Sequence, residues 1–274
     1  MKTKNLKNCK CILCDIDGTL YNWSRILSPK TKEVFTQLHN KGYLLGLASG
    51  RPYEELCEYA KSWDLDFDFD IIIGLNGAEL FVNHQLHEYY KLSKETLKEV
   101  CELMFQFECN PFLYWHKKIL CKHIDPMMIK SGQTSNRELV ECKNIDELWS
   151  EDNAKIMFRM SEDELKKVED YMTCHTSDKY IGFKTQSTLF EFMDPHISKG
   201  FGIDQLCNET NITHAQILAF GDTTNDNSML EKAGWGICLK NGSQDTKDIA
   251  DEITKDSCDQ DGFANYIIDN LFEA

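Results

Sequence analysis

Short apolar segments, each followed by an amphipathic segment, constrain the fold of this 274-residue chain most strongly. Residues 11–14, 43–48 and 71–73 are continuous apolar runs, the pattern of strands that are buried on both faces of a parallel sheet. Helical segments separate these runs, and Pro29 and Pro52 stand at their first turns. This β-α-β-α-β order predicts an α/β fold with a doubly wound parallel sheet and right-handed crossovers.

The pattern changes between residues 83 and 190, where hairpin-like strand pairs alternate with amphipathic helices. The doubly wound pattern returns in the last third of the chain. We therefore expect residues 1–82 and 191–274 to form one Rossmann-like core, and residues 83–190 to form an inserted α+β cap domain of about a hundred residues, an ordinary domain size.

The charge and the hydropathy of the chain argue against nucleic acid and membrane as partners. The chain carries 45 acidic against 30 basic residues, a net charge of −15, whereas a nucleic-acid binder normally presents a basic face. No apolar run approaches the roughly 18 residues that a membrane span needs. Residues 1–7 lead directly into the first strand, so we expect no signal peptide and a cytoplasmic location. We also expect a monomer or a weak homodimer, with neither nucleic acid nor membrane as a partner.

The 12 cysteines raise the question of a metal site. Cys9, Cys11 and Cys14 form a C-x-C-x2-C pattern, but no second cluster of Cys or His follows at finger-like spacing. Cys11 and Cys14 also flank apolar residues of the first strand, where free cysteine packs as a small hydrophobe. We therefore favour a packing role over a metal site, and the scattered remainder is typical of reduced thiols.

Polar motifs stand just past the ends of the predicted parallel strands. D-x-D-G-T begins at Asp15, S-G-R at Ser49 and G-D-x-x-N-D at Gly221, and Lys199 lies in an S-K-G sequence before a helix. The carboxyl ends of parallel strands meet at one edge, where open α/β sheets bind ligands. Carboxylates there provide hard oxygen ligands for Mg²⁺, a hydroxyl and an ammonium can hold phosphate oxygens, and one carboxylate can attack phosphorus.

This ordered set of four motifs resembles the haloacid dehalogenase superfamily. The large insert between the second and third motifs resembles the Cof-like phosphatases with a type IIB cap, and the resemblance covers essentially the whole chain. It implies a phosphoric monoester hydrolase that uses Mg²⁺ and an aspartyl-phosphate intermediate. The substrates would be small phosphorylated metabolites, such as sugar phosphates or phosphorylated cofactors. The cap would cover the strand ends and select the substrate.

The resemblance also implies roles for single residues. Asp15 would be the nucleophile, and Asp17 would protonate the leaving group and later deprotonate the attacking water. Mg²⁺ would be held by the Asp15 carboxylate, the Asp17 backbone carbonyl and Asp222. Ser49 and Lys199 would bind the oxygens of the transferring phosphoryl group. Because family members with Thr at the second position of D-x-D keep a long-lived phosphoenzyme, an aspartate at position 17 favours rapid hydrolysis.

Further residues would support this site. Asn225 and Asp226 would complete or orient the metal shell, with Asp226 placing the lysine or a metal-bound water. Gly50, within the second motif, belongs to the same supporting group. Asn76 follows the third strand at the same edge and is either a turn residue or a substrate contact. Arg51 either starts the next helix or braces the site.

Two other functions share parts of this pattern. Phosphohexomutases of the phosphomannomutase type also carry D-x-D-G-T, but holding a bisphosphate favours several cap arginines. Residues 83–190 contain only Arg137 and Arg159, so we rank this alternative below the phosphatase. A non-catalytic regulator that binds phosphate or Mg²⁺ would need neither Asp17 nor Lys199.

Overall fold

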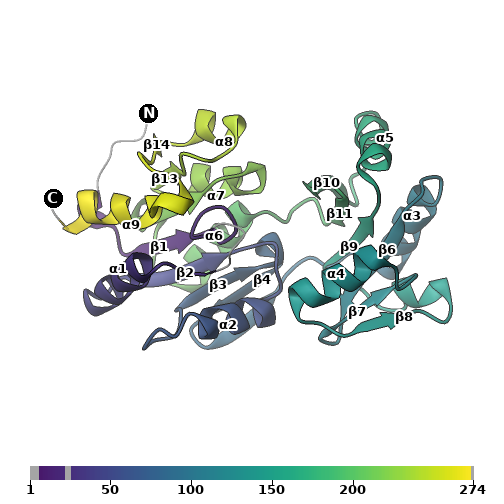
Figure 1. Ribbon diagram of the computed structural model, residues 1–274, viewed down its shortest axis with the longest axis horizontal. Coiled ribbons are helices and arrows are strands. Elements are labelled where there is room, and N and C mark those ends of the chain that lie inside the picture. The colour runs from purple at the N-terminus through teal and green to yellow at the C-terminus, as the bar shows by residue number, and fades with distance from the viewer. Residues whose placement is uncertain (1–5, 22–25, 273–274) are drawn as a thin grey trace. The chain divides into compact units, whose positions relative to one another are not determined.

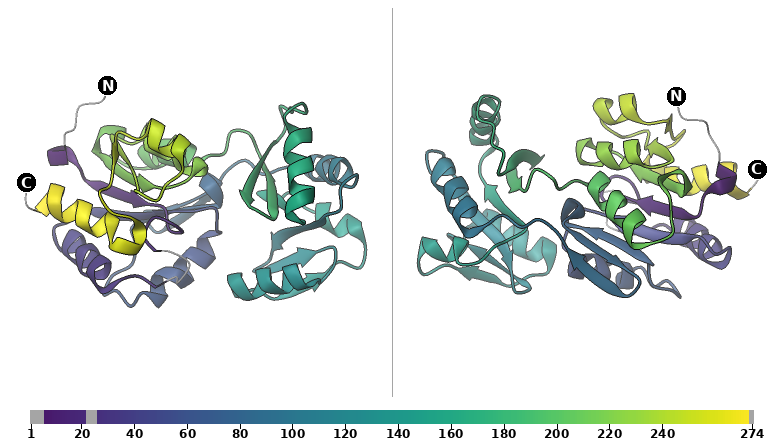
Figure 2. Two further views of the ribbon diagram at one scale, coloured as in Figure 1. Left: turned by 45° about the horizontal axis from the view of Figure 1, so that its top comes forward. Right: turned by 180° about the vertical axis from the view of Figure 1, so that it is seen from behind.

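The computed structural model describes residues 6–21 and 26–272. The first five residues, on which the expectation of no signal peptide partly depends, lie outside this described part. The structure has two compact units (Figure 1). The first contains the chain up to Tyr89 and from Ile197 onward, and the second is Tyr90–His196. The chain passes between the units twice (Figure 2).

An eight-stranded sheet forms the centre of the first unit. Its strands are β1 Cys11–Cys14, β2 Leu44–Ala48, β3 Ile71–Gly74, β4 Glu79–Val82, β5 Gln85–Glu88, β12 Ile217–Gly221, β13 Trp235–Cys238 and β14 Glu252–Ile253. The spatial order is β14-β13-β12-β1-β2-β3-β4-β5. Neighbours from β14 to β3 run parallel, and the hairpin of β4 and β5 adds two antiparallel strands at one edge.

Helices cover both faces of this sheet (Figure 1). They are α1 Pro29–Asn40, α2 Tyr53–Ser62, α6 Lys199–Glu209, α7 Asn227–Lys232, α8 Gln244–Ile249 and α9 Gly262–Ile267. One apolar cluster packs α1, α2 and α9 against the sheet, and a second packs α6 and α7. β1 contributes Ile12 and Cys14 to the first cluster and Cys11 and Leu13 to the second. This two-sided burial explains the continuous apolar run at the start of the chain.

The start of α1 shows how local chemistry sets the helix boundaries. The hydroxyl of Ser28 accepts a hydrogen bond from the backbone N–H of Thr31 at 3.0 Å, and Pro29 occupies the first helical position. This cap satisfies a backbone donor that the helix itself leaves unpaired. Phe35 and Leu38 then project into the first apolar cluster.

The second unit is an α+β arrangement around a six-stranded sheet. Its elements are α3 Lys94–Met104, β6 Asn110–Trp115, β7 Lys118–Cys121, α4 Pro126–Ser135, β8 Leu139–Glu141, β9 Lys155–Arg159, α5 Glu162–Met172, β10 Ile181–Gln186 and β11 Leu189–Met193. The strand order is β10-β11-β9-β6-β7-β8, and only β7 and β8 pair in parallel. Apolar residues of α3 and α5 pack against one face of the sheet, and Met128 of α4 packs against the other.

The expected α/β fold with a parallel-sheet core is confirmed, but the borders between the units differ from those expected at residues 82/83 and 190/191. The hairpin of β4 and β5 belongs to the larger sheet, because β4 pairs with β3. β11 pairs with β9 and β10 in the smaller sheet, which moves the second border to residue 196. The change in sequence pattern at residue 83 therefore marks a change of strand direction and not the end of the first unit.

The cysteines and the helices bear on two further expectations. All 12 thiols are free, and Cys11 and Cys14 are fully buried within β1, as the packing interpretation predicts. Burial raises the pKa of both thiols well above the ordinary value, which holds them in the protonated form. Among the residues that the structure describes, no helix is both long enough and apolar enough to cross a membrane.

Candidate active site

The candidate site lies at the carboxyl-terminal edge of the parallel strands. Asp15 directly follows β1, Ser49 follows β2, Asn76 lies in the turn after β3, and Asp222 follows β12. β1 lies between β2 and β12 in the sheet, so Asp15 occupies the middle of this edge. This is the edge at which open α/β sheets bind ligands.

Asp15 is buried, and its carboxylate pairs with the ammonium of Lys199. Nζ of Lys199 donates to Oδ1 of Asp15 at 2.6 Å and to Oδ1 of Asp226 at 2.5 Å. The lysine side chain is 0% exposed. It is the first residue of α6, a helix that the hydroxyl of Ser198 caps by accepting from the backbone N–H of Phe201. A fully buried ammonium held between two carboxylates differs from an ordinary solvated surface lysine.

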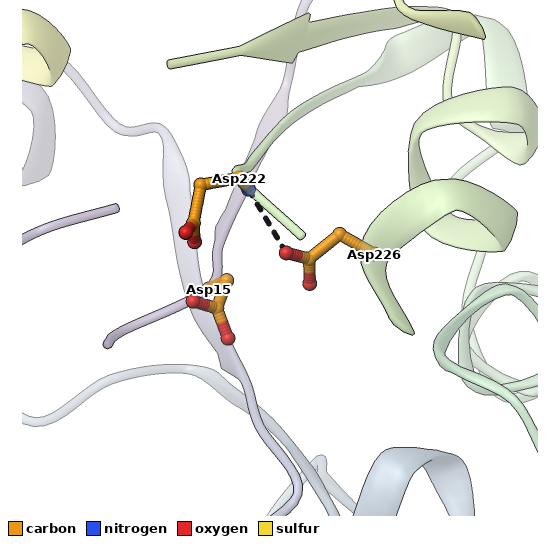
Figure 3. Close-up of side chains that lie close together, drawn as sticks. All are labelled: Asp15, Asp222 and Asp226. Carbon is orange, nitrogen blue, oxygen red and sulfur yellow. Dashed lines mark hydrogen bonds between the residues drawn. The ribbon is translucent and has the colours of Figure 1, made fainter. Parts of the chain in front are cut away.

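Asp222 completes a cluster of three carboxylates. Oxygens of Asp15, Asp222 and Asp226 all lie within 4.8 Å of one another, and Figure 3 shows the three side chains close together. Oδ2 of Asp226 accepts from the backbone N–H groups of Asp222 at 2.9 Å and Thr223 at 3.1 Å. The hydroxyl of Thr19 donates to Oδ1 of Asp222 at 2.9 Å. Asp226 is therefore engaged by the lysine and the backbone, whereas Asp15 and Asp222 have fewer partners.

The charges of this cluster do not balance. Burial and then the charge of Asp226 raise the pKa of Asp15 well above its ordinary value, and Lys199 offsets this only partly. Burial and then Asp226 also raise the pKa of Asp222 to about 7. Three carboxylates beside one ammonium leave an excess of negative charge that a divalent cation would balance.

Asn225 adds an oxygen donor on the same loop as Asp222. Its Nδ2 donates to Oδ1 of Asn76 at 3.2 Å. Its own Oδ1 is buried and has no hydrogen-bond partner within the described residues. The three carboxylates, together with an unpaired buried amide oxygen on the loop of Asp222, are hard oxygen ligands of the kind that Mg²⁺ takes in proteins. The residues present therefore fit a divalent cation.

Gly18 allows the first loop to pack closely against Asp222. Its φ is +95°, and a Cβ at this position would lie 2.3 Å from Oδ2 of Asp222. The amide of Asn241 donates to the carbonyl of Gly18 at 2.8 Å, and its Oδ1 accepts from the backbone N–H of Cys258 at 2.8 Å. The loop after β13 therefore fixes the loop after β1 in contact with the carboxylate cluster.

Asp17 does not join the cluster through its side chain. Its carboxylate is 45% exposed; Oδ2 accepts a hydrogen bond from Nε of Arg51 at 3.0 Å and forms an ion pair with Nη2 at 3.0 Å. Arg51 thus has a partner on the D-x-D-G-T loop, and the alternative in which it only starts α2 is incomplete. The contribution of the Asp17 backbone carbonyl to a metal site stays a prediction.

Ser49, Gly50 and Asn76 join two neighbouring strand ends. The backbone N–H of Asn76 donates to the carbonyl of Ser49 at 2.9 Å, and the buried hydroxyl of Ser49 accepts from the backbone N–H of Arg51 at 3.3 Å. A Cβ at Gly50 would lie 3.3 Å from Oδ1 of Asn76. Asn76 has a left-handed φ of 55°, as a turn residue, and its side chain links this turn to Asn225.

Two residues that hold the site, Thr19 and Asn241, are not among those expected from the sequence. Thr19 was recognised only as the last letter of D-x-D-G-T, although its hydroxyl bonds to Asp222. Asn241 received no role at all. The signal was present: Lys240-Asn241-Gly242 is a turn sequence directly after a buried strand of the same sheet, so its side chain emerges at the same edge.

The parallel sheet and the carboxylate–lysine cluster at its carboxyl edge place the chain among the α/β enzymes that bind their substrates at strand ends. A family model of haloacid dehalogenase-like hydrolases matches residues 12–267. The chain therefore belongs to the haloacid dehalogenase-like hydrolase family, and the resemblance drawn from the four motifs is confirmed. At the level of the family, the expectation of a phosphatase-type hydrolase is confirmed as well.

Similar proteins agree with this assignment. The 5-amino-6-(5-phospho-D-ribitylamino)uracil phosphatase YitU of Bacillus subtilis is 23% identical, over 93% of this chain and 95% of its own length. The chloroplastic endoribonuclease YBEY of Arabidopsis thaliana is 28% identical over 93% of this chain, but the chain spans only 45% of that protein. A haloacid dehalogenase-like hydrolase from Bacteroides thetaiotaomicron has a crystal structure with a TM-score of 0.83, 25% identity, and coverage of 94% of this chain and 98% of its own.

Proposed function

We propose that this chain is a Mg²⁺-dependent phosphatase that hydrolyses small phosphorylated metabolites, sugar phosphates or phosphorylated cofactors, through an aspartyl-phosphate on Asp15. The observation that carries this proposal is the fully buried ammonium of Lys199 between the carboxylates of Asp15 and Asp226. The lysine attracts the oxygens of a phosphate ester to the atom that attacks phosphorus.

The metal would be held by Asp15 and Asp222, with the Asp17 backbone carbonyl and the amide oxygen of Asn225 as further donors. A bound Mg²⁺ supplies positive charge that stabilises the phosphoryl group during its transfer. Asp226 acts in support, because its two oxygens are already bonded to Lys199 and to two backbone N–H groups.

In the first step, a carboxylate oxygen of Asp15 attacks phosphorus and the bond from phosphorus to the leaving oxygen breaks. Asp17 donates its proton to that oxygen, so the product leaves as a neutral alcohol. The hydroxyl of Ser49 and the ammonium of Lys199 hold the other phosphate oxygens. An ammonium has three N–H donors, and two point at Asp15 and Asp226, which leaves one for the phosphate.

In the second step, a water molecule attacks the phosphorus of the aspartyl-phosphate. Asp17 takes a proton from this water, and the bond between phosphorus and the Asp15 oxygen breaks. Inorganic phosphate leaves, Asp15 returns as a carboxylate, and Asp17 is protonated again for the next cycle. One carboxyl group therefore serves as acid and then as base.

The substrate class follows from charge and from the relatives. The net charge of −15 disfavours a nucleic-acid partner, and the name of the Bacillus relative specifies a small phosphorylated molecule. We propose the same class here, with selection among substrates made by the second unit. A cytoplasmic location and a monomeric or weakly dimeric state are part of this proposal.

A panel of phosphorylated metabolites tests the proposal, with released phosphate as the measurement. We expect hydrolysis with Mg²⁺, loss of activity with EDTA and recovery when Mg²⁺ is added back. Asp15→Asn serves as the control for contaminating phosphatases and should release no phosphate. Activity that EDTA leaves unchanged, or release of nucleotides from RNA in place of phosphate from metabolites, would contradict the proposal.

A further inference from the structure

Arg51 connects the loop that carries Asp17, which takes part in the proposed chemistry, with helix α2, which does not. It lies between the end of β2 and the first turn of α2, and β2 pairs with β1 directly beside the loop that carries Asp17. Its Nε donates to Oδ2 of Asp17 at 3.0 Å, and its Nη2 forms an ion pair with the same oxygen at 3.0 Å. Because both contacts are made to one oxygen, Arg51 does not use the other oxygen, Oδ1.

The arginine is anchored from its opposite side. Nη1 forms an ion pair with Glu55 and lies 3.3 Å from the hydroxyl of Tyr59, and the guanidinium lies 4.9 Å from the centre of the Tyr59 ring. Glu55 is 3% exposed and Arg51 18%, against 45% for Asp17. Burial opposes the charge of Arg51, but the carboxylates of Asp17 and Glu55 outweigh it and raise its pKa further above the ordinary range. The arginine is thus a fixed cation on α2, and Asp17 is the exposed end of the pair.

We infer that Arg51 is a positioning residue for the acid–base aspartate: it holds Oδ2 of Asp17 so that Oδ1 carries the proton between Asp17, the leaving oxygen and the attacking water. This inference rests on the proposed function. Each step stays balanced, because Oδ1 loses one proton when the P–O bond to the leaving group breaks and regains one from water when the P–O bond to Asp15 breaks. Arg51 itself exchanges no proton, and Glu55 and Tyr59 fix its orientation.

The test compares two substrates that differ in how much they need a proton. Alkyl phosphates depend on protonation of the leaving oxygen, whereas p-nitrophenyl phosphate needs little. We expect Arg51→Met to lower kcat for glycerol phosphate, or another alkyl phosphate that the wild type hydrolyses, by about 10- to 100-fold, which is less than the roughly 10²–10⁴-fold that acid–base catalysis contributes as a whole. The loss in the rate at which p-nitrophenyl phosphate releases p-nitrophenolate in the first turnover should be clearly smaller, because this release precedes hydrolysis of the shared aspartyl-phosphate. KM should change little for both substrates. Arg51→Lys keeps the charge but lacks the planar guanidinium, so its activity should lie between those of Arg51→Met and the wild type.

A double-mutant cycle with Asp17 makes the test specific. If Arg51 acts through Asp17, Arg51→Met in the Asp17→Asn background should reduce kcat by no more than about twofold. Independent, multiplicative losses would overturn the inference, as would a KM increase of equal size for both substrates, because that result would mean that Arg51 binds the phosphate itself. Activity of the wild type towards p-nitrophenyl phosphate is measured first. If this activity and hydrolysis of the metabolite panel are both absent, the proposed function fails, whereas an active wild type without coupling refutes only this inference.

Two controls separate positioning from folding. Arg51→Met leaves the buried Glu55 without its ion-pair partner, so the substitution is also made together with Glu55→Gln, and thermal unfolding is recorded for each variant. In the first unit, the ammonium of Lys41 lies 5.3 Å from the centre of the Phe272 ring, as the guanidinium of Arg51 lies over Tyr59, but it precedes β2 at the opposite end of that strand from Ser49. Lys41→Met should leave the ratio of the two rates unchanged. A changed ratio in this control, or an unchanged ratio in a folded Arg51→Met Glu55→Gln protein, would overturn the inference.

Discussion

Two aspartates that are two positions apart in the sequence lie in opposite surroundings. Asp15 is buried against the ammonium of Lys199, whereas the carboxylate of Asp17 reaches solvent and pairs with Arg51. A buried carboxylate beside a cation has a fixed position from which to attack phosphorus. An exposed carboxylate can exchange a proton with a leaving group and with water. The surroundings, and not the residue type, separate the two proposed roles.

Substitution of each aspartate by asparagine should therefore give different results. Asp15→Asn replaces the attacking oxygen by a neutral amide, so turnover and covalent labelling should both vanish. Asp17→Asn keeps the attacking group and should lower kcat by about 10²–10⁴-fold. With p-nitrophenyl phosphate, a phosphoenzyme should accumulate in Asp17→Asn and be detected after acid quench. Covalent phosphate on Asp15→Asn, or full activity in it, would mean that another residue is the nucleophile.

Asp222 allows a test of the metal site that does not depend on activity. Its raised pKa, about 7, means that the folded state favours its protonated form. In metal-free protein, Asp222→Asn should match the wild type in stability below about pH 4 and exceed it increasingly as the pH rises towards 7, by about 1–3 kcal/mol at most. Thermal unfolding of both metal-free proteins over this pH range measures the difference in stability.

The metal response provides the control. Mg²⁺ should raise the Tm of the wild type at pH 7.5 and should have little effect on Asp222→Asn, because a ligand that binds only the folded state stabilises it. An equal shift in both proteins would remove Asp222 from the metal site. A variant less stable than the metal-free wild type at pH 7.5 would contradict the surplus of negative charge.

At the level of elements, the loop after β1 depends on glycine for its approach to the carboxylate cluster. Gly18 and Gly42 both have a positive φ, +95° and +81°. A Cβ at Gly18 would lie 2.3 Å from the carboxylate of Asp222, whereas a Cβ at Gly42 would have nothing within 4 Å. Alanine at either position should cost about 1 kcal/mol of backbone strain. Gly18→Ala should in addition displace Asp222 and abolish the Mg²⁺-dependent rise in Tm, which Gly42→Ala keeps. Unfolding curves with and without Mg²⁺ compare the two, and a retained metal response in Gly18→Ala would contradict the close packing.

The sequence predicted the elements that carry strong local signals. Buried strands such as β1 and capped helices such as α1 were predicted to within a few residues, because their apolar pattern and caps are local. The helix α4 is not among the elements expected from the sequence. Asp125 caps it and Pro126 begins it, but only Met128, Gly132 and Ser135 of the helix are buried, so its apolar face is weak. The sequence also does not show that the hairpin of β4 and β5 belongs to the larger sheet, because a hairpin has the same sequence pattern in whichever unit it lies.

Within the candidate site, the sequence predicted which residues gather but not how they pair. The ends of parallel strands meet at one edge by geometry, so the grouping of Asp15 with Asp222 follows from the fold class. The pairing of Asp226 with Lys199 is implied only by the family resemblance, and the pairing of Asp17 with Arg51 is not among the expectations. Both pairs depend on the side-chain packing of elements distant in sequence. No pattern within one segment carries that information.

At the scale of the whole molecule, the two units have separate cores. The two apolar clusters around the larger sheet consist only of residues from the first unit, and the three described around the smaller sheet consist only of residues from the second. Each unit thus has its own sheet and its own buried apolar residues, as independently folding domains have. The proposed catalytic residues all belong to the first unit.

Replacement of Tyr90–His196 by a short flexible linker should therefore leave a folded first unit. We expect this shortened protein to unfold cooperatively, to show the Mg²⁺-dependent rise in Tm and to be phosphorylated on Asp15 by p-nitrophenyl phosphate. It should lose most discrimination among metabolites, because the substrate-selecting residues are proposed to lie in the excised unit. Relative kcat/KM values over the same panel measure this loss. The matched control carries Asp15→Asn in the shortened protein, which should fold equally well and take up no phosphate. If the shortened protein folds and still ranks the metabolites as the full chain does, selection is made by the first unit and the proposed role of the second is wrong.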